Sequence, residues 1–305
     1  MSTDARPMAP VIIFAYARAD HLQRTVESLL ANPEAGATDV LFYCDAAKTP
    51  GHQPKVDAVR AYVELVRGFR SIKRISRASN MGLMRSVIDG VTQTLAAHGR
   101  AIVLEDDLLL SPHFLRYMND GLARYEHDPR VASIHGYVYP CETPLPETFF
   151  LKGADCWGWA TWSRGWAHFD ADGAKLLREL RARKLTHEFD FDGQFPYTGM
   201  LQDQIAGRNS SWAILWYASC FLQGLLTLYP GRSLVENIGN DSSGTHCGTT
   251  DTFGRAPALT PVQPDAIEVE PSRIGRDAFV RFFSAQRSWK TRLRSSVKRL
   301  LVSEP

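Results

Sequence analysis

Short apolar runs alternate with amphipathic stretches over the first third of the chain. Each apolar run is typical of a buried strand, and each amphipathic stretch repeats apolar residues at helical spacing. Strands separated by helices of about ten or more residues form βαβ units, so we expect an α/β fold with a mainly parallel central sheet. The predicted strands are residues 11–15, 40–44, 72–76 and 101–104, and the predicted helices are residues 20–30, 54–69 and 84–98.

Polar residues follow each predicted strand at the point where it ends. Arg18 comes after the first strand, Asp45 after the second, the segment RASNMG at residues 77–82 after the third, and three acids at residues 105–107 after the fourth. In open parallel sheets, ligands bind outside the carboxyl ends of the strands. The pattern therefore predicts one ligand cleft that these four strand ends share.

The acidic triplet, Glu105, Asp106 and Asp107, carries the most specific chemistry. Adjacent carboxylates at the end of a buried strand repel one another, and partial burial increases that cost. A divalent cation removes the cost, and Mg²⁺ or Mn²⁺ completes its coordination with phosphates and water. The alternative is a solvated acidic loop before a helix, and Ser111 with Pro112 is typical of a helix start.

The pattern changes beyond residue 140. A Trp-rich segment, CWGWATWSRGW, precedes a charged helix at residues 174–184, and a polar loop, NIGNDSSGTHCGTTDTFG, occupies residues 237–254. Residues 254–272 are rich in Pro and acids, which is typical of a linker. Residues 276–301 repeat Phe, Trp, Leu and Val near helical spacing with Arg and Lys between them, which predicts an amphipathic C-terminal helix.

Composition and charge narrow the class of protein. Hydrophobic residues make up 44% of the 305, enough for a large α/β core, which excludes a disordered chain. Residues 273–305 hold nine Lys and Arg and two Asp and Glu, a charge of +7, while the rest of the chain holds 26 and 31, a charge of −5. The acidic body argues against nucleic-acid binding.

The N-terminus shows no signal-peptide pattern, and the first apolar run is too short to cross a bilayer, so we expect a cytoplasmic protein. Five widely spaced cysteines without a C-x-x-C motif predict reduced thiols and no structural zinc site.

Six segments, taken together and in order, resemble nucleotide-sugar-dependent glycosyltransferases of the GT-A fold: FAYARADHLQRTVESLL, LFYCDAAK, RASNMGLMRSV, AIVLEDDLLLSPHFLRYMN, CWGWATW and NIGNDSSGTHC. The resemblance spans residues 10–250 and is nearest to bacterial family-2-like polysaccharide enzymes. It extends more distantly to the animal N-acetylglucosaminyltransferase that initiates hybrid N-glycans. It implies one glycosyltransferase domain over residues 8–253, with a nucleotide-sugar half at 8–140 and an acceptor half at 141–253.

The same resemblance implies a metal-dependent, inverting transfer of a hexosyl or N-acetylhexosaminyl group. The donor would be a nucleotide sugar, with uridine diphosphate favoured, and the acceptor a glycan or lipid-linked glycan. The product would belong to a bacterial surface polysaccharide, namely O-antigen, lipopolysaccharide or capsule.

The resemblance also implies roles for the residues at the strand ends. Asp107 would bind Mn²⁺ or Mg²⁺ directly, and Glu105 and Asp106 would hold ribose hydroxyls or metal-bound water. Asp45 would recognise the nucleotide base, with Arg18 near the base or the diphosphate. The residues alone leave alternatives open, since Asp45 could cap a turn and Arg18 could lie on the surface.

Four further residues are assigned to the nucleotide sugar in the same way. Asn80 and Arg85 lie where the third strand joins the third helix, beside Gly82, which suits a turn. Trp157 offers a flat face for a pyranose, and Gly158 allows the backbone to approach a ligand closely. The three tryptophans of CWGWATW could form a wall on which a sugar stacks. Tryptophans at this spacing are also typical of a hydrophobic core, which is the alternative for Trp157, Trp159 and Trp162.

Inversion needs a base that deprotonates the acceptor hydroxyl. Asp203 is favoured because it lies between the Trp-rich segment and NSSWAILW, where related inverting enzymes place their base; an exposed helix carboxylate is the alternative. By the resemblance, His246 in the polar loop is a second metal ligand, with Asp241 as the competing choice and a hydrogen-bonded loop histidine as the alternative. The other acids of this half are Asp190 and Asp192.

The basic segment at residues 273–305 has the composition of an interfacial helix, with aromatic residues in the membrane and Arg and Lys on anionic headgroups. This predicts peripheral association with the inner face of the cytoplasmic membrane, which suits a lipid-linked acceptor. The alternative is packing on the domain or on a second subunit.

Two other classes of function stay open. One is a non-catalytic protein that binds a nucleotide sugar or a polysaccharide, against which the triplet and a candidate base argue. The other is a sugar nucleotidyltransferase, which would usually carry a Gly-rich loop with a basic residue after the first strand; FAYARADH lacks the glycines.

Overall fold

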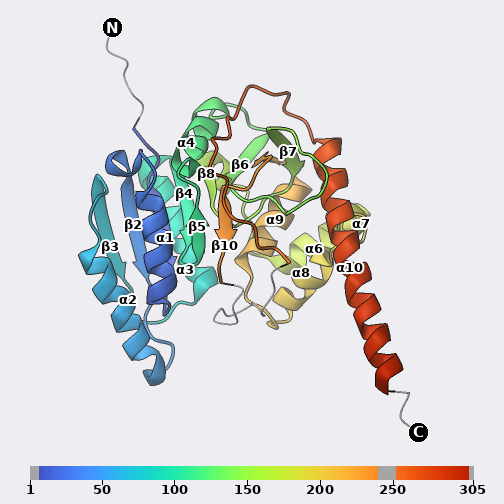
Figure 1. Ribbon diagram of the computed structural model, residues 1–305, viewed down its shortest axis with the longest axis horizontal. Helices are drawn as coiled ribbons and strands as arrows, with labels where there is room; N and C mark the ends of the chain where they lie inside the picture. Colours follow the sequence, from blue (N-terminus) through green and yellow to red (C-terminus); the bar gives the residue numbers. More distant parts are fainter. Residues whose placement is uncertain (1–6, 240–251, 302–305) are drawn as a thin grey trace.

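An eight-stranded sheet runs through the body of the protein in the order β3-β2-β1-β4-β8-β6-β9-β7 (Figure 1). The computed structural model describes residues 7–239 and 252–301, with side chains through residue 287. Helices flank the sheet on both faces, which confirms the predicted α/β class. The strands are β1 (Val11–Ala15), β2 (Asp39–Cys44), β3 (Ser71–Ser76), β4 (Arg100–Glu105), β6 (Val131–His135), β7 (Thr148–Lys152), β8 (Trp159–Trp162) and β9 (Leu226–Pro230).

The first half of the sheet is parallel and follows the predicted βαβ pattern. β3, β2, β1 and β4 pair in parallel. Residues of β1 alternate between two cores: Val11 and Ile13 pack with α1 and α2, and Ile12 and Phe14 pack with α3. A strand buried on both faces must be apolar throughout, which explains the sequence VIIFA. The helices are α1 (Ala19–Leu30), α2 (Gln53–Leu65) and α3 (Leu83–His98), with short 3₁₀ turns at Ala35–Ala37 and Pro50–His52.

The second half of the sheet is mixed. β8 pairs antiparallel with β4 and β6, β6 pairs parallel with β9, and β7 pairs antiparallel with β9. A small antiparallel sheet joins β5 (Leu108–Leu110) to β10 (Val235–Asn237) and brings the end of β10 next to the acidic triplet. The helices of this half are α4 (Phe114–Arg124), α5 (Ser163–Trp166), α6 (Gly173–Ala182), α7 (Thr186–Phe189), α8 (Tyr197–Ile205) and α9 (Trp212–Leu222).

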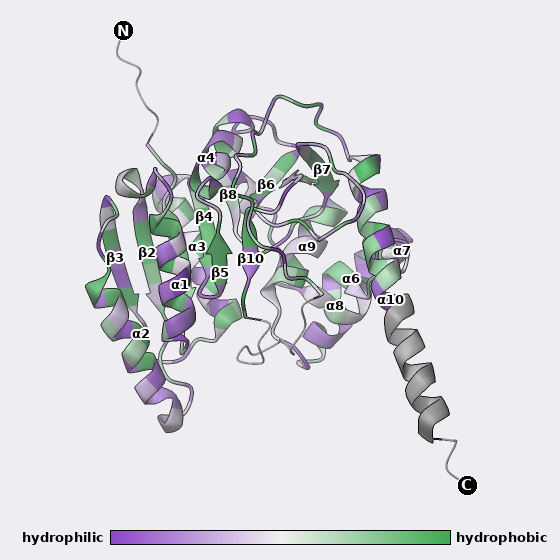
Figure 2. Cartoon of the chain, viewed as in Figure 1, coloured by the Kyte–Doolittle hydropathy of each residue, from purple (hydrophilic) through white to green (hydrophobic). Residues whose placement is uncertain are grey.

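Apolar residues are concentrated inside the molecule. In Figure 2, β4 and β5 are mostly green, whereas α1 shows purple residues on its outward face. Every residue of α9 except Ala213 is buried, because this helix packs between other elements. Trp159 is fully buried against the rings of Trp166, Trp212 and Trp216, in the core on one face of the sheet.

The chain from residue 252 onward lies over the second half of the body. Residues 254–272 hold no helix or strand, but Ser111 and Tyr125 donate hydrogen bonds to carbonyl oxygens in this segment. Helix α10 (Arg273–Leu301) follows, and its first half packs through Phe279 and Phe283 while its second half projects away from the body (Figure 1). No helix within the described ranges is long and apolar enough to cross a membrane.

Candidate nucleotide-sugar site

The acidic triplet lies at the carboxyl end of β4, as the sequence predicted, and faces Arg18. Arg18 occupies the N-cap position of α1, directly after β1, and β1 is the parallel neighbour of β4. Its guanidinium forms an ion pair with Asp106 and a second one, at 2.9 Å, with Oδ2 of Asp107. Asp106 and Asp107 are both 4% exposed. The fold therefore buries two carboxylates, and within the described residues Arg18 is the one cationic side chain that forms ion pairs with them.

Burial and mutual repulsion set the electrostatics of this cluster. Burial raises the pKa of Glu105 to about 8, and the charges of Asp107 and Asp106 add to that shift. Burial also raises the pKa of Asp106, although Arg18 opposes the shift. Burial alone would lower the pKa of Arg18, but Asp106 and Asp107 outweigh it and hold that pKa above its ordinary value. The cluster carries more negative charge than one arginine neutralises, so it favours a further cation.

Asp107 has one carboxylate oxygen available for that cation. Its Oδ1 is buried and has no hydrogen-bond partner among residues 7–239 and 252–287, while Oδ2 lies on Arg18. Gly239 packs so closely that a Cβ atom there would lie 2.0 Å from Oδ2, so only glycine fits. A hard divalent ion suits this oxygen, with further ligands from a bound phosphate and water. Among residues 7–239 and 252–301, no three His, Cys, Asp or Glu side chains are grouped to hold a metal; His246 and Asp241 lie outside these ranges.

Asp45 and Asn80 meet at the neighbouring strand ends, where Asp45 fixes a turn. Its carboxylate accepts hydrogen bonds from the backbone of Ala46, Met81 and Gly82 and from the Asn80 amide, at 2.9–3.0 Å. Gly82 has φ +73°, which favours glycine. These bonds use the four acceptor positions of the carboxylate, so contact with a nucleotide base would require one of them to be exchanged. Recognition of the base by Asp45 stays a prediction.

Arg85 lies on the first turn of α3, directly after this turn, and its side chain is exposed. It is not among the residues that line the pocket described next. A helix N-terminus with an adjacent arginine suits an anionic group, so the prediction that Arg85 binds the donor stands untested.

A cavity of about 460 Å³ opens beside the triplet. One end is lined by Arg18, Glu105 and Asp107, and Asn209 and Ser211 contribute polar groups. Much of the remaining wall is aromatic, with Trp157 edge-on to Tyr137 and Phe253. Such rings suit the apolar faces of sugars. The aromatic residues that line the cavity are Tyr139, Trp157, Phe195, Tyr197, Trp212, Tyr217 and Phe253.

The tryptophan motif divides between this wall and the core. Trp157 lines the cavity, and its contact with the sugar stays a prediction. Trp159 and Trp162 lie on β8 and are 0% and 4% exposed, so the interpretation of all three as a sugar-stacking wall is wrong for these two. Gly158 has φ +64°, and a Cβ atom there would lie 2.8 Å from the Val235 side chain. Gly158 therefore allows close packing against Val235, and Gly158 itself is not among the residues that line the cavity.

Two carboxylates of the second half differ in their surroundings. Asp203, the predicted base, lies on α8, is 48% exposed, forms an ion pair with Arg208 and is not among the residues that line the cavity. Asp155 does line the cavity, and sequence reasoning missed it. Its position directly before CWGWATW was the only local signal, because its other neighbours come from distant parts of the chain.

No protein-family model and no curated protein matches the chain. Among solved structures, it is similar to the mannosyltransferase PcManGT from Pyrobaculum calidifontis, in complex with GDP-Man and Mn²⁺ (17% identity, 45% of this chain, 36% of that chain, TM-score 0.34). It is also similar to TarS of S. aureus (13% identity, 48% of this chain, 25% of that chain, TM-score 0.32). A third similar structure is a UDP-glucose pyrophosphorylase complexed with UDP-glucose (12% identity, 73% of this chain, 90% of that chain, TM-score 0.37). The chain thus aligns with well under two thirds of the first two proteins, and likeness at these TM-scores does not determine an activity.

Proposed function

We propose that the protein is a metal-dependent, inverting glycosyltransferase that takes a sugar from a nucleoside-diphosphate sugar. The observation that carries the proposal is the buried Oδ1 of Asp107, which has no hydrogen-bond partner within the described part of the chain and belongs to an acidic cluster that lines a largely aromatic cavity. A buried carboxylate oxygen without a partner is unfavourable, and a bound cation removes that cost. The cavity beside it is large enough for a sugar.

The residues of the cluster divide the work of holding the donor. Asp107 would bind Mn²⁺ or Mg²⁺ through Oδ1, and the ion when bound supplies the Lewis acid that stabilises the departing diphosphate. Glu105 and Asp106 would accept hydrogen bonds from ribose hydroxyls or metal-bound water. Arg18 would remain beside the diphosphate, where its charge limits repulsion between the carboxylates and the phosphates.

The nucleotide would lie along the strand ends toward β2 and β3. Asn80 and the turn that Asp45 fixes would face it, and Arg85 on the first turn of α3 would attract the diphosphate. The transferred sugar would enter the cavity, against Trp157. His246 is proposed as the second protein ligand of the ion.

The acceptor that we propose is a glycan, or a lipid-linked glycan, of a bacterial surface polysaccharide. Support comes from residues 273–305, which carry a charge of +7 and include α10, whose second half extends past the body (Figure 1). A basic amphipathic helix of this kind binds anionic headgroups. Sedimentation with vesicles of phosphatidylglycerol tests membrane binding through α10, with vesicles of phosphatidylcholine and a chain ending at residue 287 as controls. If the truncated chain binds as well as the full chain, α10 is not the membrane contact.

The reaction itself is tested by incubating the protein with Mn²⁺ and, separately, UDP-glucose, UDP-N-acetylglucosamine and GDP-mannose, and by measuring the released nucleoside diphosphate. A glycosyltransferase releases nucleoside diphosphate, with water or methyl glycosides as acceptors. A sugar nucleotidyltransferase instead forms pyrophosphate from a nucleoside triphosphate and a sugar 1-phosphate. A parallel incubation with a nucleoside triphosphate and a sugar 1-phosphate measures pyrophosphate. Pyrophosphate release there, with no release of nucleoside diphosphate from the nucleotide sugars, would contradict the proposal.

A further inference from the structure

One carboxylate in the cavity has no part in the donor site described above. Within the described residues, the carboxylates that line the cavity are Glu105, Asp107 and Asp155. Asp155 comes from the loop between β7 and β8 and therefore from the acceptor half of the chain. Its side chain is 22% exposed. It is thus both sheltered and open to a bound molecule.

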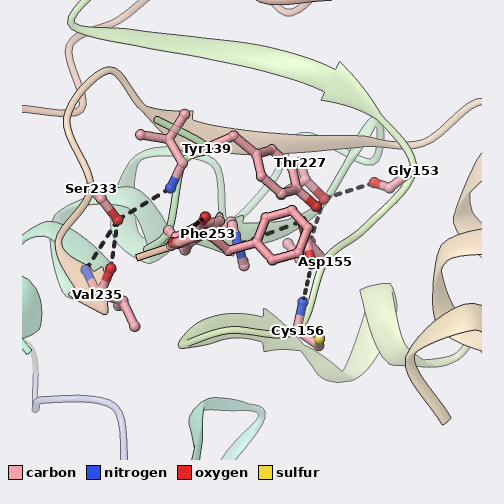
Figure 3. Close-up of polar contacts among 12 residues, drawn as sticks. Tyr139, Gly153, Asp155, Cys156, Thr227, Ser233, Val235 and Phe253 are labelled. Carbon is pink, nitrogen blue, oxygen red and sulfur yellow. Dashed lines mark hydrogen bonds and ion pairs between the residues drawn. The ribbon is translucent and has the colours of Figure 1, made fainter. Parts of the chain in front are cut away.

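The Asp155 carboxylate is held in place by a backbone hydrogen bond. Its Oδ1 accepts a hydrogen bond of 2.8 Å from the backbone nitrogen of Cys156, as Figure 3 shows. Its Oδ2 lies 3.7 Å from Nε2 of His135, beyond hydrogen-bond distance. His135 is fully buried and burial lowers its pKa, so the ring stays neutral at pH 7. In the described part of the chain, no lysine or arginine forms an ion pair with Asp155.

Asp155 stands where the acidic end of the cavity meets the aromatic wall. The adjacent Cys156 also lines the cavity, together with Glu105 and Asp107, and burial with the charges of these carboxylates raises the pKa of its thiol. On the other side, Tyr197 of the aromatic wall is close enough that the charge of Asp155 adds to the effect of burial in raising its pKa.

We propose that Asp155 is the general base of the transfer reaction. This inference rests on the proposed glycosyltransferase function. The acceptor O–H bond breaks and its proton passes to the Asp155 carboxylate, while the acceptor oxygen forms a bond to the anomeric carbon of the donor. The bond from that carbon to the diphosphate oxygen breaks, and its electron pair leaves with the nucleoside diphosphate.

Asp155 meets the requirements of this step better than Asp203 does. A base has to lie within hydrogen-bond reach of the acceptor in the cavity, and Asp155 lines the cavity. The Asp203 carboxylate instead accepts a hydrogen bond of 2.7 Å from Nε of Arg208 and is not among the residues that line the cavity. The two aspartates make a matched pair for a test, because each can be changed to asparagine at nearly constant volume.

The experiment compares the full chain with Asp155→Asn and Asp203→Asn. Two quantities are measured with Mn²⁺ and each of UDP-glucose, UDP-N-acetylglucosamine and GDP-mannose: the rise of the melting midpoint, which reports donor binding, and the rate of nucleoside diphosphate release with methyl glycosides as acceptors. Asparagine keeps the acceptor for the Cys156 N–H, and the midpoint without ligand reports whether the variant folds. Asp155→Ser serves as a second variant with the same expected outcome.

We expect Asp155→Asn to keep the donor-dependent rise and to lose at least ~100-fold in release rate, since general base catalysis contributes that much. Asp203→Asn should stay within about threefold of the wild type. Release that survives in Asp155→Asn, or a donor-dependent rise that disappears in it, overturns the assignment of the base while the proposed function stands. A wild type that shows neither a rise nor release overturns the proposed function and this inference with it.

Discussion

Replacing Arg18 by methionine should destabilise the protein, because the change leaves two buried carboxylates without their cation. Methionine keeps much of the aliphatic volume of the side chain, so the lost charge dominates the effect. Removing one partner of a buried ion pair costs about 3–5 kcal/mol. The Arg18 side chain is 20% exposed, and solvent screens part of the lost interaction, so we expect a loss of about 2–4 kcal/mol at pH 8.

The loss should depend on pH, and its sign follows from the carboxylates. Without Arg18, the pKa of Asp106 rises further above its ordinary value, so the folded state holds a proton that the unfolded state releases. The pKa of Asp106 is about 6 in the folded wild type, so both proteins lose stability alike up to that pH. The deficit of Arg18→Met should therefore be small near pH 4 and grow as pH rises above 6 toward 8. Mn²⁺ should restore part of it, since the ion can replace the missing charge.

Urea unfolding followed by tryptophan fluorescence at several pH values, with EDTA or with Mn²⁺, measures the free energy of unfolding. Arg70→Met is the control, because Arg70 forms its ion pair with Asp39 at the surface and its loss should change little. A deficit for Arg18→Met below about 0.5 kcal/mol at every pH would refute the reasoning, since the threshold is the size of an ordinary surface substitution.

Three further outcomes are expected. The folded carboxyl of Glu105 has a pKa of about 8, so the wild type should lose stability as pH rises from about 4.5 toward 8. Glu105→Gln should remove this pH-dependent loss, and urea unfolding near pH 7 should show the two proteins differing in it by roughly 2–3 kcal/mol. Arg276→Met should loosen α10 by about 1 kcal/mol, because its paired bonds to Asp192 at 2.7 and 2.8 Å are lost, and hydrogen exchange at residues 276–287 should rise. Gly153→Ala should cost about 2 kcal/mol or more in thermal unfolding, because φ is +101° and the new Cβ would lie 2.3 Å from the Tyr217 ring; an unchanged midpoint would contradict this contact.

The parallel half of the fold could be predicted from the sequence because its information is local. The apolar runs of β1, β2 and β4 are long enough to specify strands alone, and the predicted helices agree with α1, α2 and α3 within a few residues. The carboxyl ends of parallel neighbours meet at one edge, so the approach of Arg18 to the acidic triplet followed from topology.

The second half depends on contacts between distant segments. β7 is the edge strand beside β9 in the described sheet, and nothing within TFFLK distinguishes a strand from a buried loop. Trp159 and Trp162 differ from Trp157 only in that β8 carries them into the core. Asp155 became a candidate because residues from β6, α8 and α9 surround it, and no local pattern encodes that environment.

The central claim, that Asp107 holds a metal-dependent nucleotide site, is tested most directly by a thermal-shift panel. UDP, GDP, CMP, TDP and ADP are added with and without Mn²⁺ to the wild type, to Asp107→Asn and to Asp57→Asn, a control at an exposed position on α2. A ligand that binds only the folded protein raises its midpoint. The account predicts that one nucleotide raises the midpoint of the wild type and of Asp57→Asn only when Mn²⁺ is present, and leaves Asp107→Asn unchanged. An equal rise in Asp107→Asn, or no rise in the wild type with any nucleotide, would contradict it.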